Sequence, residues 1–318
     1  MFYLISFLLW LLLRWMFKDS IWWLALINSY ILWFFLPLPI LFVVGLLRRQ
    51  TRSLLYLVVP ILIFTWLYGA LLYPPPRAEI LENGRVLTAM TFNLLTKNYD
   101  FPAIVKAIQS ADADVVGLQE VHPRHANALQ EMLSQEYPYQ FYPPPENIND
   151  VAILSRYPFE ISTPIIIPPR DKALYARLDV DGQEVHVFVA HLMPNQPLRR
   201  GDQSLSKHFS QRFSFRSKEI LVIQKLYCDL QGPALLLCDC NLTDTSQAYR
   251  ILDATWDDSF QEVGWGLGLT AITEPVPFPM QRIDYIWHTS QFIPMQAMVG
   301  TDGGSDHLPV VSELVLLP

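Results

Sequence analysis

Residues 235–241 read Leu-Leu-Leu-Cys-Asp-Cys-Asn, an apolar run that ends in polar side chains. A short continuous apolar run is typical of a strand that is buried on both faces. Because side chains alternate along a strand, Asp239 lies on one face while Cys238 and Cys240 share the other. Two cysteines at this spacing rarely form a disulfide, so we expect none. The run predicts a core strand that presents an acid near its end.

Other apolar segments of the chain also end in, or contain, short polar side chains. In layered α/β folds, functional groups collect at strand ends, where ligands bind. Any one of these residues alone would be explained by a turn or by a satisfied hydrogen bond, but their number favours a functional site. The positions are Asn93, Glu120, His191, Asp239, Asn241, Asp284, Asp306 and His307.

The segments between these positions predict strands mixed with amphipathic helices. Residues 173–180 and 184–190 flank an Asp181-Gly182 turn, which predicts a β-hairpin. A hairpin beside strand–helix units indicates an α/β fold with a mixed sheet. The other predicted elements are strands at 86–92, 115–118, 151–154, 234–237, 283–287 and 309–316, and helices around 101–108 and 220–230.

The first 73 residues differ from the rest in composition and charge. They carry five basic residues and one acid, a net charge of +4, whereas the remaining 245 residues carry 18 basic and 29 acidic residues, a net charge of −11. The whole chain is 51% hydrophobic and only 17% charged, against about 25% charged residues in soluble proteins. This composition excludes a disordered chain and predicts a membrane segment joined to a soluble region.

Two uncharged runs are long enough to cross a bilayer. Residues 21–47 and 53–76 hold 27 and 24 residues without a charge, and a span needs about 20. Residues 1–17 are a third, shorter candidate, interrupted by Arg14. A buried helical core of a soluble protein is the alternative.

Three arginines and no acid lie between the two long runs, at positions 48, 49 and 52. Such turns stay in the cytoplasm, so we expect the region that follows to be extracytoplasmic. The predicted organisation is a membrane anchor of about three transmembrane helices at 1–73, a linker at 74–84 and a large soluble domain at 85–318. The lipid bilayer is the expected partner of the anchor, and no protein partner is predicted.

The polar set matches metal-assisted hydrolysis of a phosphoester. Glu120 and Asp306 offer hard oxygen ligands suited to Mg²⁺ or Mn²⁺. The chain has no Gly-rich phosphate loop and no Gly-x-Ser-x-Gly motif. The remaining chemistry is attack of water on phosphorus, with a metal and hydrogen-bond donors stabilising the developing charge.

The other polar residues have matching roles. His191 and His307 can donate to phosphate oxygens, and Asp284 can hold one imidazole in its useful tautomer. Asp239 can align or deprotonate the attacking water, and Asn241 can fix its direction.

Six motifs resemble the endonuclease/exonuclease/phosphatase superfamily in order and spacing. They are Thr91-Phe92-Asn93, Leu118-Gln119-Glu120, Ala190-His191-Leu192, Cys238-Asp239-Cys240-Asn241, Arg282-Ile283-Asp284-Tyr285 and Ser305-Asp306-His307. The resemblance covers residues 85–318, and the N-terminal spans are similar to the bacterial membrane-anchored branch of the superfamily. It implies a DNase I-like four-layer sandwich, with two mixed β-sheets face to face and helices outside. Together with the charges at 48, 49 and 52, it places the expected catalytic domain outside the bacterial plasma membrane.

The resemblance also implies a role for each residue. It implies metal binding at Glu120, with Asn93 and Asp306 nearby. The other implied roles are positioning of water and phosphate by Asp239 and Asn241, phosphate contact by His191, and general-base or transition-state donor action by His307 paired with Asp284.

Residues 199–218 hold six basic groups and one acid. They are either a solvated loop entering a helix or a positive flap that gathers an anionic substrate or lipid heads. In the second case Arg216 is expected to contact the substrate.

We expect the phosphoester to be a lipid, a small molecule or a nucleic acid; a DNA or RNA endonuclease or exonuclease is the enzymatic alternative. A catalytically decayed membrane scaffold is the non-enzymatic one. A transporter is disfavoured, because the spans hold few polar residues beyond Asn28 and Ser29.

Overall fold

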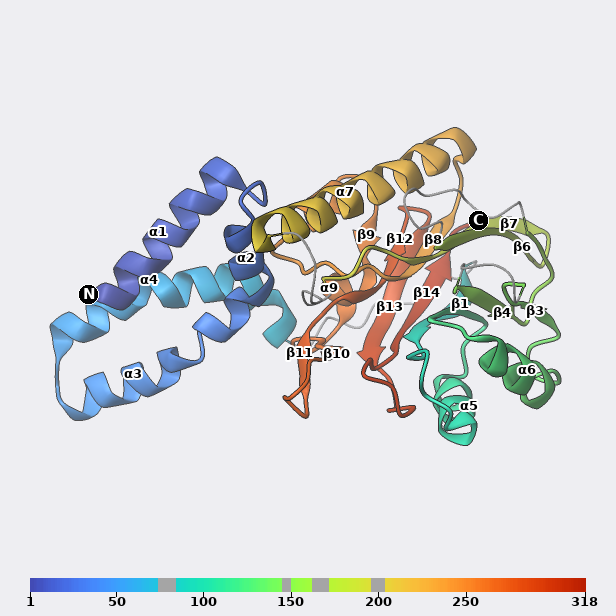
Figure 1. The fold of residues 1–318 in the computed structure, drawn as a ribbon, viewed down its shortest axis with the longest axis horizontal. Coiled ribbons are helices and arrows are strands. Elements are labelled where there is room, and N and C mark those ends of the chain that lie inside the picture. The colour runs from blue at the N-terminus through green and yellow to red at the C-terminus, as the bar shows by residue number, and fades with distance from the viewer. Residues whose placement is uncertain (74–83, 145–149, 162–171, 196–203) are drawn as a thin grey trace.

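The soluble region folds as two sheets of six strands that lie face to face, preceded by a group of apolar helices (Figure 1). Most of the predicted linker at 74–84 lies outside the described residues. The computed structural model describes residues 1–73, 84–144, 150–161, 172–195 and 204–318.

The first sheet has the strand order β13-β14-β1-β2-β4-β3. It is mixed, because β1 and β2 run parallel while the other neighbours run antiparallel. Its strands are β1 (Arg85–Asn93), β2 (Val115–Gln119), β3 (Tyr139–Phe141), β4 (Ala152–Ser155), β13 (Phe292–Val299) and β14 (Val310–Leu316).

The second sheet has the order β5-β6-β7-β8-β12-β9 and is also mixed, because only β7 and β8 run parallel. The predicted hairpin is confirmed as β6 and β7, which turn at Asp181 and Gly182. The strands are β5 (Phe159–Ile161), β6 (Ala173–Val180), β7 (Gln183–His191), β8 (Ala234–Asp239), β9 (Asp257–Asp258) and β12 (Asp284–His288). A separate pair is formed by β10 (Ala271–Ile272) and β11 (Pro279–Gln281).

Helices cover the outer face of each sheet, as Figure 1 shows for α7 on one side and α5 and α6 on the other. Ile220 and Ile223 of α7 pack on the outer face of the second sheet, and Ile104 and Leu129 pack on that of the first. The predicted four-layer DNase I-like sandwich is therefore confirmed. The helices are α5 (Phe101–Ala111), α6 (Pro123–Met132), α7 (Leu205–Leu230), α8 (Gln247–Asp253) and α9 (Ser259–Val263).

Strand β8 explains why the run at 235–241 is apolar throughout. Leu235 and Leu237 face the core between the sheets, whereas Leu236 and Cys238 face the helical layer. Asp239 falls on the inner face by the same alternation. The expectation of free cysteines here was wrong. Cys238 and Cys240 form a disulfide, since their side chains share the outer face with Cα atoms 5.1 Å apart.

The two sheets approach each other closely at Gly117 in β2. A Cβ atom at this position would lie 2.8 Å from Cβ of Leu237 and 3.1 Å from Cγ1 of Val189. Only a glycine leaves room for the facing strand here. The residues that follow Gly117 and Leu237 lead directly to Glu120 and Asp239.

The N-terminal region forms four apolar helices and one short turn of 3₁₀ helix. Of the helices that the structure describes, α4 alone is long and apolar enough to cross a membrane; α2 and α3 together would be a second candidate, and α1 is shorter. The elements are α1 (Phe2–Phe17), α2 (Trp22–Phe34), α3 (Pro37–Leu47), α4 (Thr51–Tyr68) and η1 (Ala70–Leu72).

The predicted span at 21–47 is not one straight helix. It bends by 46° between α2 and α3, where Pro37 opens α3. Proline has no N–H to donate to the preceding turn, and its ring clashes with a continuing helix, so the break falls there.

Helix α2 docks on the soluble region through hydrogen bonds. Nε1 of Trp33 donates to the carbonyl oxygen of Met280 at 2.9 Å, and Nε2 of Gln281 donates to that of Ser29 at 3.2 Å. The hydroxyl of Thr245 donates to the carbonyl oxygen of Asn28. The buried side chains of Asn28 and Ser29 have partners of their own, since Oδ1 of Asn28 accepts from Nε1 of Trp10 and Oγ of Ser29 donates to the carbonyl oxygen of Ala25.

We predict that Gly117→Ala destabilises the protein by about 1–3 kcal/mol, the usual cost of overpacking a core. The added methyl group must displace Leu237 or force the sheets apart. The free energy of unfolding of the full chain in detergent, measured by denaturant titration, tests this.

Gly182→Asn is the matched control. Gly182 has no atom within 4 Å of an added Cβ, but its φ of +92° disfavours any side chain, so this variant measures backbone strain without overpacking. An unchanged free energy of unfolding in Gly117→Ala would contradict the close contact of the sheets.

Candidate active site

Strand ends from both sheets meet at one edge of the sandwich. Strand β1 ends at Asn93. The parallel strand β2 ends one residue before Glu120. The parallel strands β7 and β8 end at His191 and Asp239, and Asp239 pairs in register with Asp284 at the start of β12. Because parallel neighbours end at the same edge, the fold brings these predicted residues together.

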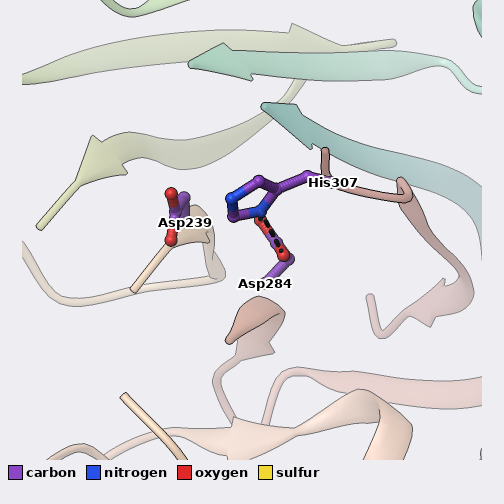
Figure 2. A group of neighbouring side chains, drawn as sticks. All are labelled: Asp239, Asp284 and His307. Atoms are coloured by element: carbon purple, nitrogen blue, oxygen red, sulfur yellow. Dashed lines mark hydrogen bonds and ion pairs between the residues drawn. The ribbon is translucent and has the colours of Figure 1, made fainter. Parts of the chain in front are cut away.

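The carboxylate of Asp284 and the imidazole of His307 form a hydrogen-bonded pair. Nδ1 of His307 lies 2.9 Å from Oδ2 and 3.1 Å from Oδ1 of Asp284. The hydroxyl of Thr270 donates to Oδ2 of Asp284 at 2.6 Å. Figure 2 shows the ring of His307 between the carboxylates of Asp284 and Asp239. Burial opposes protonation of His307, but these carboxylates outweigh it and raise the pKa of the imidazole to about 10.

Asp239 is 1% exposed and is fixed by hydrogen bonds. Its Oδ2 accepts from Nδ2 of Asn93 at 2.9 Å, and its Oδ1 accepts from the backbone N–H of Asn241 at 3.1 Å. Nε2 of His191 lies 3.6 Å from Oδ2. Burial raises the pKa of Asp239, and the carboxylate of Asp284 adds to the effect against the opposing charges of the imidazoles. A carboxylate with a raised pKa is suited to accept a proton.

Glu120 follows β2 in a left-handed conformation, with a φ of +55°. Thr96 donates to its Oε2 from both the backbone N–H and the hydroxyl at 3.0 Å, and Nδ2 of Asn93 lies 3.5 Å from its Oε1. Burial opposes ionisation of Glu120, but the hydrogen bonds from Thr96 and Asn93 and the charge of His191 outweigh it and lower the pKa of the carboxyl. Burial raises the pKa of Asp306, and the charge of Glu120 adds to this shift.

These acids form a donor set that fits a divalent cation. Asp239, Asp284 and His307 each place one nitrogen or oxygen atom within 4.8 Å of the others, but His307 with its raised pKa is protonated and offers no lone pair to a metal. Glu120 and Asp306 lie close enough for one carboxylate to disfavour ionisation of the other. Several carboxylates held together in a buried place are disfavoured unless a cation neutralises them. Their hard oxygen atoms are the ligands that Mg²⁺ and Mn²⁺ prefer.

A second pair of histidine and carboxylate, not predicted from the sequence, lies beside the first. Nδ1 of His191 lies 3.3 Å from Oδ2 of Asp150, which also contacts Nζ of Lys172. Burial opposes ionisation of Asp150, but His191 and Lys172 outweigh it and lower the pKa of this carboxyl to about 2. Asp150 therefore stays ionised and orients His191 with Nε2 toward Asp239. The available signal was an acid placed just before the apolar strand β4.

Asn241 borders the cluster without pointing its amide into it. Its backbone N–H bonds to Asp239, but its Nδ2 donates to the carbonyl oxygen of Leu192 at 3.1 Å. Its φ of +51° places it in the left-handed region, which asparagine tolerates. Asn241 thus ties the end of β8 to the segment after β7.

Arg216 contacts the segment that follows His191. It belongs to α7 and is 1% exposed, and its Nε and Nη2 donate to the carbonyl oxygen of Met193 at 2.9 and 2.6 Å. Nη2 also donates to Oδ1 of Asn195 at 2.7 Å. This guanidinium fixes the segment after His191, a placement that does not support direct contact with substrate.

The positive flap expected at 199–218 also takes a different form. Residues 205–218 are the first turns of α7, so their basic side chains project from a helix. Arg199 and Arg200 lie outside the described residues.

Comparison with known families agrees with this geometry. Residues 90–307 match the profile of the Endonuclease/Exonuclease/phosphatase family. The chain belongs to this family. A comparison with curated proteins finds no match.

Solved structures of the endonuclease/exonuclease/phosphatase family share the fold of this chain. A family protein from Bacteroides vulgatus gives a TM-score of 0.59 at 19% identity, covering 73% of this chain and 99% of its own. The mannosyl-6-phosphatase of Bacteroides thetaiotaomicron gives 0.56 at 20% identity, covering 72% and 100%. TDP2 of D. rerio, complexed with a single-strand DNA product, gives 0.56 at 18% identity, covering 72% and 98%.

We predict that His307 stays protonated well above neutral pH in the metal-free protein. Its folded pKa of about 10 exceeds the ordinary 6.5, so the charged pair stabilises the fold fully below pH 6.5 and less as pH rises through 10. An NMR titration of the ring in chelator measures this pKa.

Asp284→Asn should lower that pKa, because it removes the hydrogen-bonded carboxylate that most favours the imidazolium. Glu131→Gln, a change on the exposed side of α6, should leave it unaltered. An imidazole that titrates near 6.5 in the unmodified protein would show that the pair is not formed.

Proposed function

We propose that the protein is a divalent-metal-dependent phosphoesterase that is anchored to a membrane. The observation that carries this proposal is the buried Asp284–His307 pair, whose ring faces Asp239. At one edge of the sandwich, a proton-accepting carboxylate can activate the attacking water while a fixed imidazolium donates a hydrogen bond to the phosphate. Membership of the endonuclease/exonuclease/phosphatase family supports hydrolysis of this bond class.

In the proposed mechanism, Asp239 aligns or deprotonates the attacking water. The water oxygen bonds to phosphorus as the bond to the leaving oxygen breaks. His307 donates a hydrogen bond to a phosphate oxygen, in keeping with its raised pKa. His191 contacts the same phosphate through Nε2, and Asn241 fixes the loop that follows Asp239.

We propose Glu120 and Asp306 as ligands of Mg²⁺ or Mn²⁺, with Asn93 contributing through its Oδ1. When bound, the cation supplies positive charge that stabilises the transition state. Asn93 also has a structural task, because its Nδ2 contacts the carboxylates of both Asp239 and Glu120.

The proposed substrate is a lipid-type or small phosphoester. The residues after 73 carry a net charge of −11, which disfavours tight nonspecific binding to nucleic acid. The anchor docks at Thr245 and Gln281, which are close in sequence to Asn241 and Asp284. A membrane lipid near this edge would have a high effective concentration.

We predict that the full chain in detergent cleaves an activated bis-aryl phosphate with Mg²⁺ and loses this activity in chelator. Asp239→Asn should lower kcat about 100-fold or more at saturating Mg²⁺, the usual contribution of a positioned proton acceptor. Glu120→Gln should instead raise the Mg²⁺ concentration needed for half-maximal rate by about 10-fold or more.

Glu131→Gln is the control for both variants and should keep the full rate, because this exposed acid lies on α6. A rate that persists in chelator, or no rate with any divalent metal, would falsify the proposed activity. A competition panel of DNA, RNA, phospholipid and inositol phosphate then assigns the substrate class; preference for DNA or RNA would favour a nuclease.

We further propose the organisation of anchor at 1–73, linker at 74–84 and catalytic domain at 85–318, with the catalytic domain extracytoplasmic. In Figure 1 the N-terminus and the turn between α3 and α4 lie at the end of the helices far from the sheets. That turn carries Arg48 and Arg49, which supports its placement in the cytoplasm.

A reporter enzyme that works only outside the cytoplasm should therefore be active when fused after Pro318 and inactive when inserted after Arg49. The reverse pattern would overturn this orientation, and activity at neither position would argue against a membrane location.

A further inference from the structure

A polar cavity lies where the anchor meets the catalytic domain. Its volume is about 240 Å³, and it lies between the end of α1, the start of α2 and helix α8. Three cations line it: Arg14 and Lys18 from the anchor, and Arg250 from α8. Thr245 and Gln247 add polar groups to the wall on the catalytic side.

Arg14 is an incompletely satisfied charge in this cavity. It is 8% exposed, and its Nη1 is buried without a hydrogen-bond partner among the described residues. Its Cζ lies 5.3 Å from the centre of the Trp10 ring, which supports the guanidinium on one side. A buried charged donor without an acceptor is costly, so an acceptor from outside the chain would be stabilised here.

Asp19, the single acid that lines the cavity, already accepts hydrogen bonds from other groups of the protein. Oδ1 of Asp19 accepts from Nδ2 of Asn28 at 2.7 Å, and its Oδ2 accepts from the backbone N–H of Gln247. Among the described residues, no ion pair involves Arg14, Lys18 or Arg250; the neighbouring acids Asp244 and Asp258 pair with Arg282 instead. The cavity therefore carries excess positive charge.

The position of the cavity indicates where its ligand comes from. Arg14 lies in the last turn of α1 and Lys18 just after it, at the end of the helix that meets the catalytic domain (Figure 1). Trp22 and Trp23 begin α2 shortly after Lys18 in the sequence, and tryptophan is enriched at the boundary between bilayer and water. If the anchor spans the membrane as proposed above, lipid headgroups lie at this height.

We propose that the cavity binds the phosphate group of an anionic phospholipid. Guanidinium groups suit phosphate oxygens because they present parallel N–H donors. Arg14 would donate from within the cavity, and Arg250 and Lys18 from its rim, where they are exposed. The lipid would bind across the junction, contacting both the anchor and α8, and would hold the two together.

The test uses the full chain in mixed micelles with chelator present, so that no hydrolysis contributes. Phosphatidylglycerol should raise the thermal unfolding midpoint in a saturable way, phosphatidylcholine should not, and inorganic phosphate should act only at far higher concentration. Arg250→Gln should weaken the apparent phosphatidylglycerol affinity at least tenfold. Arg14→Met should remove the shift, because it takes away the buried guanidinium and leaves an apolar side chain beside the Trp10 ring.

Arg48→Gln is the matched control, since it removes an exposed cation from the far end of the helices. An equal loss of affinity in Arg48→Gln and Arg250→Gln would mean diffuse attraction to charged micelles and would overturn the proposal. So would equal shifts from both lipids, or saturation by inorganic phosphate at the concentrations at which the lipid acts. Asp239→Asn should keep the lipid response, so failure of the proposed catalysis and failure of this site can be told apart.

Discussion

The contact between the two sheets at Gly117 and Leu237 is the constraint on which the site depends. Gly117 lies three residues before Glu120, and Leu237 lies two residues before Asp239. The absence of a side chain at Gly117 lets the strands approach until Asn93 reaches both acids with one amide nitrogen. A larger distance between the sheets would separate Glu120 from Asp239, because the two acids come from different sheets. The distance between the sheets therefore sets the distance between these acids.

Each histidine of the site is paired with its own acid on the side away from the centre. Asp284 holds His307 and Asp150 holds His191, and both rings turn toward Asp239. A buried carboxylate fixes the tautomer of an imidazole and stabilises its charged form. The centre of the cluster therefore combines two imidazole rings with carboxylates, an arrangement suited to a phosphate group and a hard cation together.

Much of this could be predicted from the sequence because it rests on local pattern. Alternation and apolar runs identify the strands, and a short polar residue at a strand end marks the site edge without knowledge of the fold. Contacts between distant segments could not be predicted in this way. Asp150 contacts His191 and Lys172, and Thr270 donates to Asp284. Arg216 donates from a buried helix face to the carbonyl oxygen of Met193, a contact that its basic character alone does not predict. The break at Pro37 and the Cys238–Cys240 disulfide could not be predicted from local pattern either. A proline can begin, kink or end a helix, and a cysteine can be free or bonded.

The hydrogen bonds between α2 and the catalytic domain have a mechanical consequence. Thr245 and Gln281 form hydrogen bonds with α2 from two loops. These loops adjoin β8 and β12, which carry Asp239 and Asp284. The soluble region is thus held to α2 by direct hydrogen bonds. A tilt of α2 would displace both loops and, with them, the acids that lie next to these loops in the sequence.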